Sequence, residues 1–227
     1  MFQGFSGATV DFMWGIRFNN EKSWFEAHKE DYITHFQRPM KELANEVYTR
    51  FLDEHPDLDL VCKVSRIYRD ARRLFGRGPY KDHLWLSLVR PHVEAGSEPV
   101  FWFELAPEEW SCGMGFWMAP PLTMAKFRAR MDRDPKPMEQ LARRFNKQDQ
   151  FLLEGEDYKR PKPAPSPLLD PWYRKKSFAL SHSAPPSGPA VEPCPGRHAA
   201  GQLYLFAALL PVCPLSQRRS RSPAGLN

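Results

Sequence analysis

Apolar residues recur at helical spacing through the first part of the chain. Positions three and four residues apart predict a first helix after Ser6, a residue type that caps helix N-termini, and a second helix that begins near Asn20. Pro39 either ends the second helix or begins a third one. The third helix stops at His55 and Pro56. The apolar positions of the third helix are Met40, Leu43, Ala44, Val47, Tyr48 and Phe51. Stripes of this kind normally face a core, so we expect these helices to pack on one.

The spacing changes to period two in the middle of the chain. Residues 60–65 alternate between apolar and more polar side chains, which is the pattern of a half-buried strand that ends at Arg66 and Arg69. Further strands are predicted for three ranges, 84–89, 100–105 and 110–118. The links between them are short, and short links favour antiparallel pairing.

Helical spacing returns after the strands. One helix is predicted to start at the Pro120-Pro121 pair and another to cover residues 138–145, while the Pro-rich residues 159–171 predict an extended arm. Helices, then antiparallel strands, then helices again indicate the α+β class. We therefore expect a single α+β domain over residues 1–182, with N-terminal helices, a central antiparallel sheet of about four or more strands, and further helices packed on it.

Composition narrows the class of protein. The 227 residues are 42% hydrophobic, which is enough to bury one core. The longest apolar run, residues 203–212, is shorter than a membrane helix, and the N-terminus lacks a signal-peptide pattern, so we expect a cytoplasmic protein with no membrane partner. The four cysteines are far apart, which argues against a disulfide framework or a zinc ribbon, and we expect Cys62 and Cys112 to be buried thiols.

Positive charge is concentrated in one segment, residues 63–81. It contains seven Lys or Arg residues and one acid, Asp70, which gives a net charge of +6, whereas the whole chain carries +5. The basicity therefore belongs to one segment and not to the surface at large. A local concentration of cations is the sequence signal of a site for an anion.

The residue types of this segment suit a small anion. A turn with two glycines, Gly76 and Gly78, sits among arginines and can direct guanidinium groups and backbone N–H groups at phosphate or carboxylate. It is neither a P-loop nor a dinucleotide-binding fingerprint. The candidate anion-binding residues are Arg66, Arg69, Asp70, Arg73, Tyr80 and Lys81. In a purely structural alternative, Asp70 forms a bidentate pair with Arg66 or Arg69 and only locks the loop.

Several separated motifs give the chain a resemblance to a known family. They are Phe2-x-Gly4-Phe5-Ser6, Asn19-Asn20, Trp24-Phe25, His28-Lys29, Arg66-Ile67-x-Arg69-Asp70 and Pro79-Tyr80-Lys81. In this order they resemble the conserved-hypothetical family called domain of unknown function 2461, from residue 1 to about 182. Family members usually carry Arg-Phe-Ser and Asp-Lys where this chain has the basic, glycine-flanked residues 72–78. The resemblance implies a fold and a candidate site, not an activity, and it adds Asn20, Trp24 and His28 as candidate pocket residues.

Three classes of function stay open at this point. A phosphorylated or carboxylate small molecule is one expected partner; nucleic acid is another, with Tyr68, Phe75 or Tyr80 stacking on bases. A hydrolase or transferase acting on a phosphorylated small molecule would need an acid–base group, and the nearest are His28 and the Asp82-His83 pair. No cluster of ligands has metal spacing, so no cofactor or metal is expected.

The last part of the chain departs from the family. Residues 183–227 are rich in Pro, Ala and Arg and contain a single acid, Glu192. If suitable codons are assumed, residues 191–192 and 202–213 translate in the next reading frame into a sequence that resembles the ending expected of the family. We hypothesise a frameshift near residues 183–190; an ordinary disordered tail is the alternative.

Overall fold

The computed structural model describes residues 2–116 and 118–186, apart from the side chain of Arg73. The tail after residue 186, and with it the frameshift hypothesis, lies outside these residues. The described residues form two compact units. The first holds residues 2–91, 100–114 and 181–186, and the second holds residues 92–99, 115–116 and 118–180.

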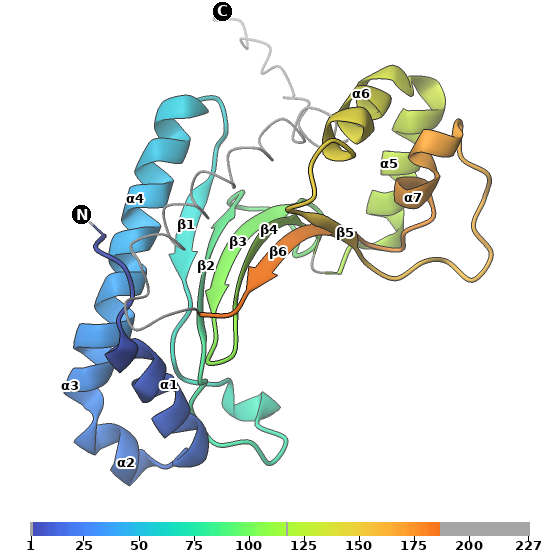
Figure 1. The fold of residues 1–227 in the computed structure, drawn as a ribbon. Helices are drawn as coiled ribbons and strands as arrows, with labels where there is room; N and C mark the ends of the chain where they lie inside the picture. The colour runs from blue at the N-terminus through green and yellow to red at the C-terminus, as the bar shows by residue number, and fades with distance from the viewer. Residues whose placement is uncertain (1, 117, 187–227) are drawn as a thin grey trace, which may run out of the picture. The chain divides into compact units, whose positions relative to one another are not determined.

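Helices precede the first strand along the chain, and the last two strands alternate with the later helices, as Figure 1 shows. The helical elements are α1 (Gly7–Phe18), α2 (Lys22–Ala27), α3 (Lys29–Asp31), the π-helix η1 (Tyr32–Gln37), α4 (Arg38–Glu54), the 3₁₀ turn η2 (Ala71–Arg73), α5 (Pro121–Arg133), α6 (Lys136–Phe145), the 3₁₀ turn η3 (Pro167–Leu169) and α7 (Asp170–Tyr173). The strands are β1 (Val61–Val64), β2 (Leu84–Val89), β3 (Val100–Leu105), β4 (Trp110–Gly115), β5 (Leu152–Glu154) and β6 (Ala179–Ala184).

The strands form a six-stranded antiparallel sheet in the order β1-β2-β3-β4-β6-β5. The α+β class predicted from the sequence is confirmed, with N-terminal helices, an antiparallel sheet and further helices, although β5 and β6 come after α5 and α6 in the chain. Two strands of the sheet, β5 and β6, were not predicted, and β4 ends at Gly115 and not at residue 118.

The first unit has its core between the N-terminal helices and one face of the sheet. Alternate residues of β2 and β3 are buried, and Leu86 lies directly opposite Phe103 on the neighbouring strand. The Phe103 ring stacks on that of Phe5 with 6.2 Å between centroids, and Phe51 of α4 packs on Phe101 at 5.0 Å. Because full burial of such a side chain contributes about 1.5–3 kcal/mol, this face supplies much of the stability of the unit.

The opposite face of the same strands carries polar and aromatic side chains. Trp85 of β2 lies directly opposite Glu104 of β3, and Ser87 lies opposite both Trp102 and Lys63 on the two flanking strands. The side chains of one face alternate with those of the other along a strand, so the buried leucines of β2 place Trp85 and Ser87 on this second face. The basic segment ends at Lys81, just before β2, and the Lys81 Nζ lies over the Trp85 ring on this face.

A buried hydroxyl supports the π-helical segment between α3 and α4. Pro39 has no N–H to donate to the carbonyl of His35, four residues earlier. The hydroxyl of Thr9, which is 0% exposed, donates to that carbonyl at 2.6 Å and accepts from the N–H of Ser6 at 3.1 Å. One side chain of α1 therefore satisfies a carbonyl that proline leaves open and also closes the first turn of its own helix.

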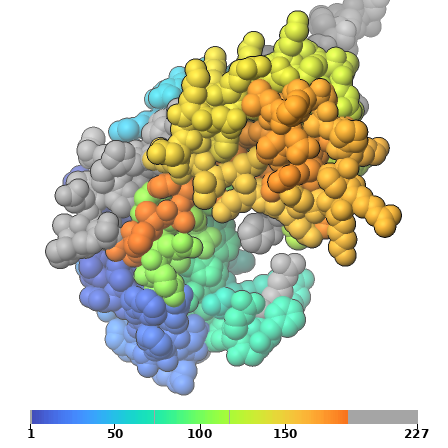
Figure 2. All heavy atoms as spheres, turned by 45° about the vertical axis from the view of Figure 1, so that its right-hand side comes forward, coloured from blue at the N-terminus to red at the C-terminus, as the bar shows by residue number. Residues whose placement is uncertain are grey.

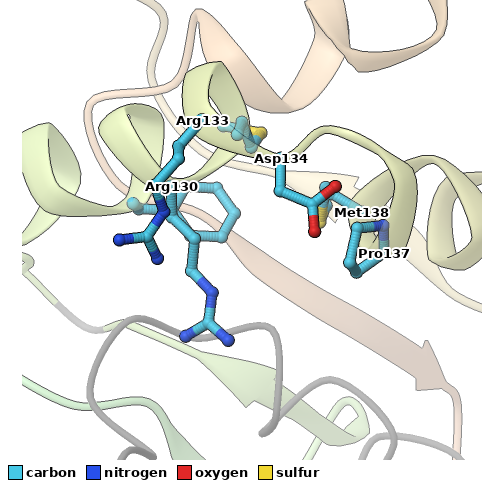
Figure 3. Close-up of a pocket in the computed structure, with 7 residues that line it drawn as sticks. Arg130, Arg133, Asp134, Pro137 and Met138 are labelled. Atoms are coloured by element: carbon cyan, nitrogen blue, oxygen red, sulfur yellow. The ribbon is translucent and has the colours of Figure 1, made fainter.

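The second unit packs α5, α6 and the segment around α7 on one another. Trp172 is buried, and its ring lies 5.3 Å from that of Phe145 and 5.6 Å from that of Phe178. A cavity of about 230 Å³ opens between α5 and α6 (Figure 3). It is lined by Phe127, Arg130, Met131, Arg133, Asp134, Pro137 and Met138. None of the helices in the described parts of the chain is both long and apolar enough to cross a membrane.

Candidate functional site

The basic segment folds into a loop whose two ends run antiparallel. The N–H of Lys81 donates to the carbonyl of Ile67 at 2.7 Å, and the N–H of Arg69 donates to that of Pro79 at 2.8 Å. These bonds form a neck at residues 67–69 and 79–81, from which residues 70–78 extend as a tip. Figure 2 shows the turquoise atoms of this loop at the lower edge of the molecule, beside the blue N-terminal helices.

The pairing in the neck decides which side chains converge. Tyr68 and Tyr80 lie opposite each other, and their ring centroids are 5.4 Å apart, so both rings occupy one side of the neck. Because successive side chains of an extended strand alternate, Arg69 and Lys81 point to the other side. The neck therefore brings together two of the cations that the sequence marks as candidates, although they are twelve positions apart.

Asn20 fastens the neck to the end of α1. Its Oδ1 accepts from the N–H of Tyr80 at 2.9 Å, and its Nδ2 donates to the carbonyl of the same residue at 2.9 Å. A Cβ at position 78 would overlap the Asn20 amide, which explains the glycine there. The Nε of Arg69 donates to the Tyr80 carbonyl as well, at 2.8 Å. Asn20, predicted as a pocket residue, thus holds the backbone of the loop.

The Tyr80 ring is part of the core and is not an accessible surface for stacking a base. It is 3% exposed, and its ring stacks on that of Phe25 with 4.3 Å between centroids. Burial raises the pKa of its hydroxyl. Tyr68, on the same side of the neck, is 53% exposed, so the two candidate stacking residues differ in access.

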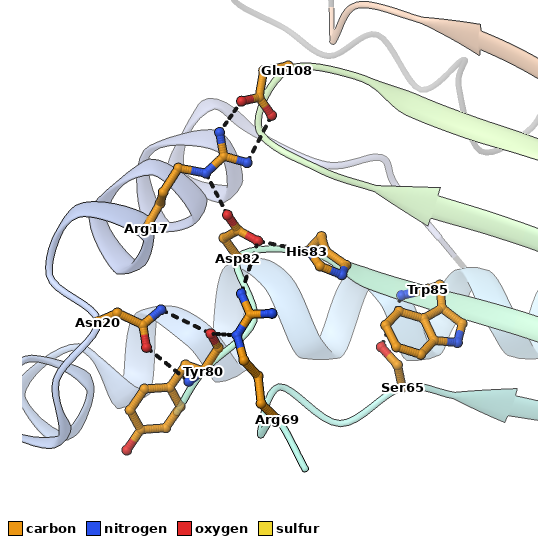
Figure 4. Close-up of polar contacts among 9 residues, drawn as sticks. All are labelled: Arg17, Asn20, Ser65, Arg69, Tyr80, Asp82, His83, Trp85 and Glu108. Carbon is orange, nitrogen blue, oxygen red and sulfur yellow. Dashed lines mark hydrogen bonds and ion pairs between the residues drawn. The ribbon is translucent and has the colours of Figure 1, made fainter. Parts of the chain in front are cut away.

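Asp82, next to the neck, stands at the centre of a network of charged side chains (Figure 4). Its Oδ2 lies 2.5 Å from the Nε of Arg17, and its Oδ1 lies 2.8 Å from the Nδ1 of His83. The Nη2 of Arg69 is 3.9 Å from the same Oδ1. Arg17 also forms a bidentate pair with Glu108, in which Nη2 lies 3.0 Å from Oε2. Three segments of the first unit, α1, the neck and residues 82–83, therefore meet at the Asp82 carboxylate, and Glu108 joins them through Arg17.

The network keeps Asp82 ionised. The hydrogen bonds from His83 and from Arg17 hold the pKa of its carboxyl well below the ordinary value, against the opposing effect of burial. Since that carboxylate accepts from Nδ1 of His83, the proton of a neutral His83 ring belongs on Nδ1 and the Nε2 atom keeps its lone pair. The arrangement resembles the acid–base pairs in which a carboxylate orients a histidine.

Lys81 lies beside this network in a positive environment. Its Nζ is 4.1 Å from the centroid of the Trp85 ring, a cation–π contact. Burial, followed by the charges of Arg69 and Arg66, lowers the pKa of the Lys81 ammonium to about 8, although Glu104 acts in the opposite direction. Burial also lowers the pKa of Arg69; the charge of Asp82 opposes this effect, and Arg77 makes a smaller contribution in the same direction as burial. The cations of the loop are thus close enough to influence one another.

The tip of the loop is exposed and tightly turned. Phe75 has a φ of 46° and Gly76 a φ of 78°, and the Phe75 side chain is 82% exposed. Asp70 accepts from the backbone N–H of Arg72 at 3.1 Å and pairs with its guanidinium at 3.0 and 2.9 Å. The bidentate partner of Asp70 is therefore Arg72, and not Arg66 or Arg69 as the structural alternative proposed. Arg73 ends the turn η2, and its side chain lies outside the description.

The other predicted pocket residues lie in the helical layer. His28 follows α2, where its ring stacks on that of Trp24 at 3.9 Å and its Nδ1 lies 2.9 Å from the Trp24 carbonyl. The Trp24 ring also occupies the space beside Gly15, where a Cβ would meet it at 2.6 Å. Both side chains thus have packing roles within the helices.

Sequence reasoning missed part of the site. Arg17 and Glu108 come from α1 and from the turn between β3 and β4, and nothing in their local pattern marks them. Trp85 carried a usable signal, because the spacing of positions 81, 83 and 85 is that of one strand face. Within residues 2–116 and 118–186 no group of three His, Cys, Asp or Glu side chains is arranged to hold a metal ion.

Comparison with known proteins identifies the family of the chain. Residues 8–195 match the model of the family described as "Conserved hypothetical protein (DUF2461)". The chain belongs to this family, and the match extends beyond residue 182, where the recognisable motifs end. No curated protein matches the chain.

Proposed function

We propose that the chain binds a small anion, phosphate or carboxylate, at a cationic cluster formed by Arg66, Arg69, Arg77 and Lys81. The observation that carries the proposal is the position of Lys81, whose ammonium is half-buried beside Arg66 and Arg69 and has a pKa lowered to about 8. Burial is the largest cause of this lowered pKa, and the positive charges of Arg69 and Arg66 lower it further. A bound anion would offset these positive charges.

The nearby acids support this view because they are already engaged. Asp82 is shared by Arg17 and His83, and Arg69 reaches it only at 3.9 Å. Glu104 raises the pKa of Lys81, but its contribution is smaller than those of burial and the two arginines. The guanidinium groups of Arg66 and Arg77, exposed at the base and tip of the loop, are suited to charge-assisted hydrogen bonds with an added anion.

Titration of the full chain with inorganic phosphate and with succinate, followed by calorimetry, tests the proposal. Arg66→Gln and Arg77→Gln should each weaken phosphate binding by about tenfold, since a charge-assisted hydrogen bond contributes about 1.5–3 kcal/mol. Arg38→Gln, at an exposed position of α4, is the matched control and should bind like the wild type. Equal phosphate affinity in all four proteins would exclude the cluster as the binding site.

Single-stranded nucleic acid is a second candidate ligand, which one observation favours. Tyr68 and Phe75 lie on the loop itself and are 53% and 82% exposed. Aromatic side chains beside cations are the elements with which proteins stack and hold single strands. An oligonucleotide bound there should dissociate steeply with added salt and lose affinity in Phe75→Ala, whereas phosphate binding should depend little on Phe75.

A further inference from the structure

Lys81 and His83 meet at one aromatic side chain. The Nζ of Lys81 is 4.1 Å from the centroid of the Trp85 ring, and the His83 ring lies 5.8 Å from the same ring at an angle of 24°. An amine and an imidazole therefore lie on one side of the strand, next to the cationic cluster. Leu84 and Leu86 are buried on the opposite face, so neither polar group can turn into the core.

The surroundings of Lys81 make its amine partly neutral near physiological pH. The charged groups that act on it are Arg69, Arg66 and Glu104, and in the described parts of the chain no carboxylate forms an ion pair with its Nζ. With a pKa of about 8, roughly a tenth of the Lys81 amine carries a free lone pair at pH 7 and about half at pH 8. Desolvation and a neighbouring cation are the two means by which proteins activate a lysine as a nucleophile.

We propose that Lys81 is an amine nucleophile that forms an imine with a small aldehyde or ketone bearing a phosphate or carboxylate group. This inference rests on the proposed function, because the anionic group of the ligand would be held by Arg66 and Arg77 while its carbonyl carbon meets Nζ. An anion site next to a reactive amine selects one class of ligand, the anionic carbonyl compounds, over neutral carbonyl compounds.

The chemistry is balanced and needs no oxidant or reductant. The lone pair of the neutral Lys81 amine forms a bond to the carbonyl carbon, and the π electrons of the carbonyl move to its oxygen. A proton then passes from nitrogen to oxygen to give a carbinolamine, and loss of water leaves the imine. Proton transfer in both steps can use Nε2 of His83, because Nδ1 is held by Asp82 at 2.8 Å.

Reductive trapping on the full chain tests the inference. The protein is mixed at pH 8 with less than one equivalent of pyridoxal 5′-phosphate, which carries both an aldehyde and a phosphate, then reduced with borohydride and mapped by mass spectrometry. We expect Lys81 to be labelled at least about tenfold faster than Lys63, the exposed lysine of β1, because a lowered pKa leaves a larger fraction of the Lys81 amine neutral and able to attack. Pyridoxal without phosphate should label Lys81 more slowly.

Variants and competition separate this inference from the proposed function. Excess inorganic phosphate and the Arg66→Gln change should both slow labelling of Lys81, whereas Lys63→Arg should leave it unaltered. If phosphate binds at the cluster but Lys81 is labelled no faster than Lys63, the imine chemistry is excluded and the anion site stands. If phosphate does not bind at the cluster, the proposed function fails first. A His83→Gln variant that binds phosphate and labels Lys81 at the wild-type rate would overturn the role of His83.

Discussion

The side-chain amide of Asn20 bonds both hydrogen-bonding groups of the Tyr80 backbone, each at 2.9 Å. An amide is the only common side chain that offers a donor and an acceptor side by side in this way. The contact joins the end of α1 to the neck of the basic loop across 60 residues of sequence. It therefore determines where Arg69 and Lys81 are placed, and it can be tested directly.

Replacing this amide should loosen the loop. Asn20→Ala leaves the N–H and the carbonyl of Tyr80 without the amide partner, so we expect a loss of about 1–3 kcal/mol in the free energy of unfolding, measured by urea denaturation. Asn45→Ala, at an exposed position of α4, is the control and should change stability by less than about 0.5 kcal/mol. Equal losses in both variants would show that the amide contributes nothing specific.

Two glycines of the loop should respond differently to alanine. At Gly76 a Cβ meets open space and only the φ of 78° is unfavourable, so Gly76→Ala should cost about 1 kcal/mol. At Gly78 a Cβ would overlap the Asn20 amide. Gly78→Ala should therefore cost more in the wild type than in the Asn20→Ala background, and urea unfolding of the double-mutant cycle measures this difference. Strict additivity would contradict the contact.

The buried hydroxyl of Thr9 should matter more than its size suggests. Thr9→Val keeps the shape but leaves the His35 carbonyl without the hydroxyl donor, and we expect a loss of about 1–3 kcal/mol on thermal or urea unfolding. Thr49→Val, made at an exposed position of α4, controls for the chemical change. If both substitutions behave alike, the π-helical carbonyl does not depend on Thr9.

Acid should destabilise the first unit through Asp82. Its folded-state pKa lies below the ordinary value of 3.8, so its contribution to stability is present above about pH 4 and is lost as the pH falls through that range towards the folded-state pKa. Asp82→Asn should flatten the fall in the free energy of unfolding between about pH 5 and about pH 3, because the substituted side chain no longer titrates. Asp53→Asn, exposed in α4, controls for the loss of one negative charge.

Alkali should have the opposite effect through Lys81. Because its pKa is lowered from 10.5 to about 8 in the folded state, the unfolded chain binds the proton more tightly, and stability rises as the pH increases between these values. Lys81→Met should therefore stabilise the fold at pH 7 by about 0.5–1 kcal/mol, a modest figure because the site is half-exposed. The gain should vanish near pH 10.5, whereas Lys63→Met should show no such trend.

Short-range pattern accounts for what could be predicted of the fold. The bounds of β2 and β3 follow from alternation within six residues, and α4 follows from a stripe that repeats within its own length. The weaker strand β6 carries Ser181, His182 and Ser183, whose residue types do not favour strands, and it forms because its neighbours in the sheet supply partners. Strands of this kind are decided by tertiary context.

In the candidate site, too, some features follow from local sequence and others from tertiary contacts. Sequence alone determined the α+β class, the family and the address of the cations, because charge composition and periodicity are local properties of a segment. Tertiary structure decided that Asp82 pairs with Arg17, 65 positions away, and that Arg17 holds Glu108 across 91 positions. It also decided that Asn20 hydrogen-bonds the backbone of the loop and that Lys81 packs on the Trp85 ring. Contacts between distant segments depend on how the whole chain packs, and no local pattern records them.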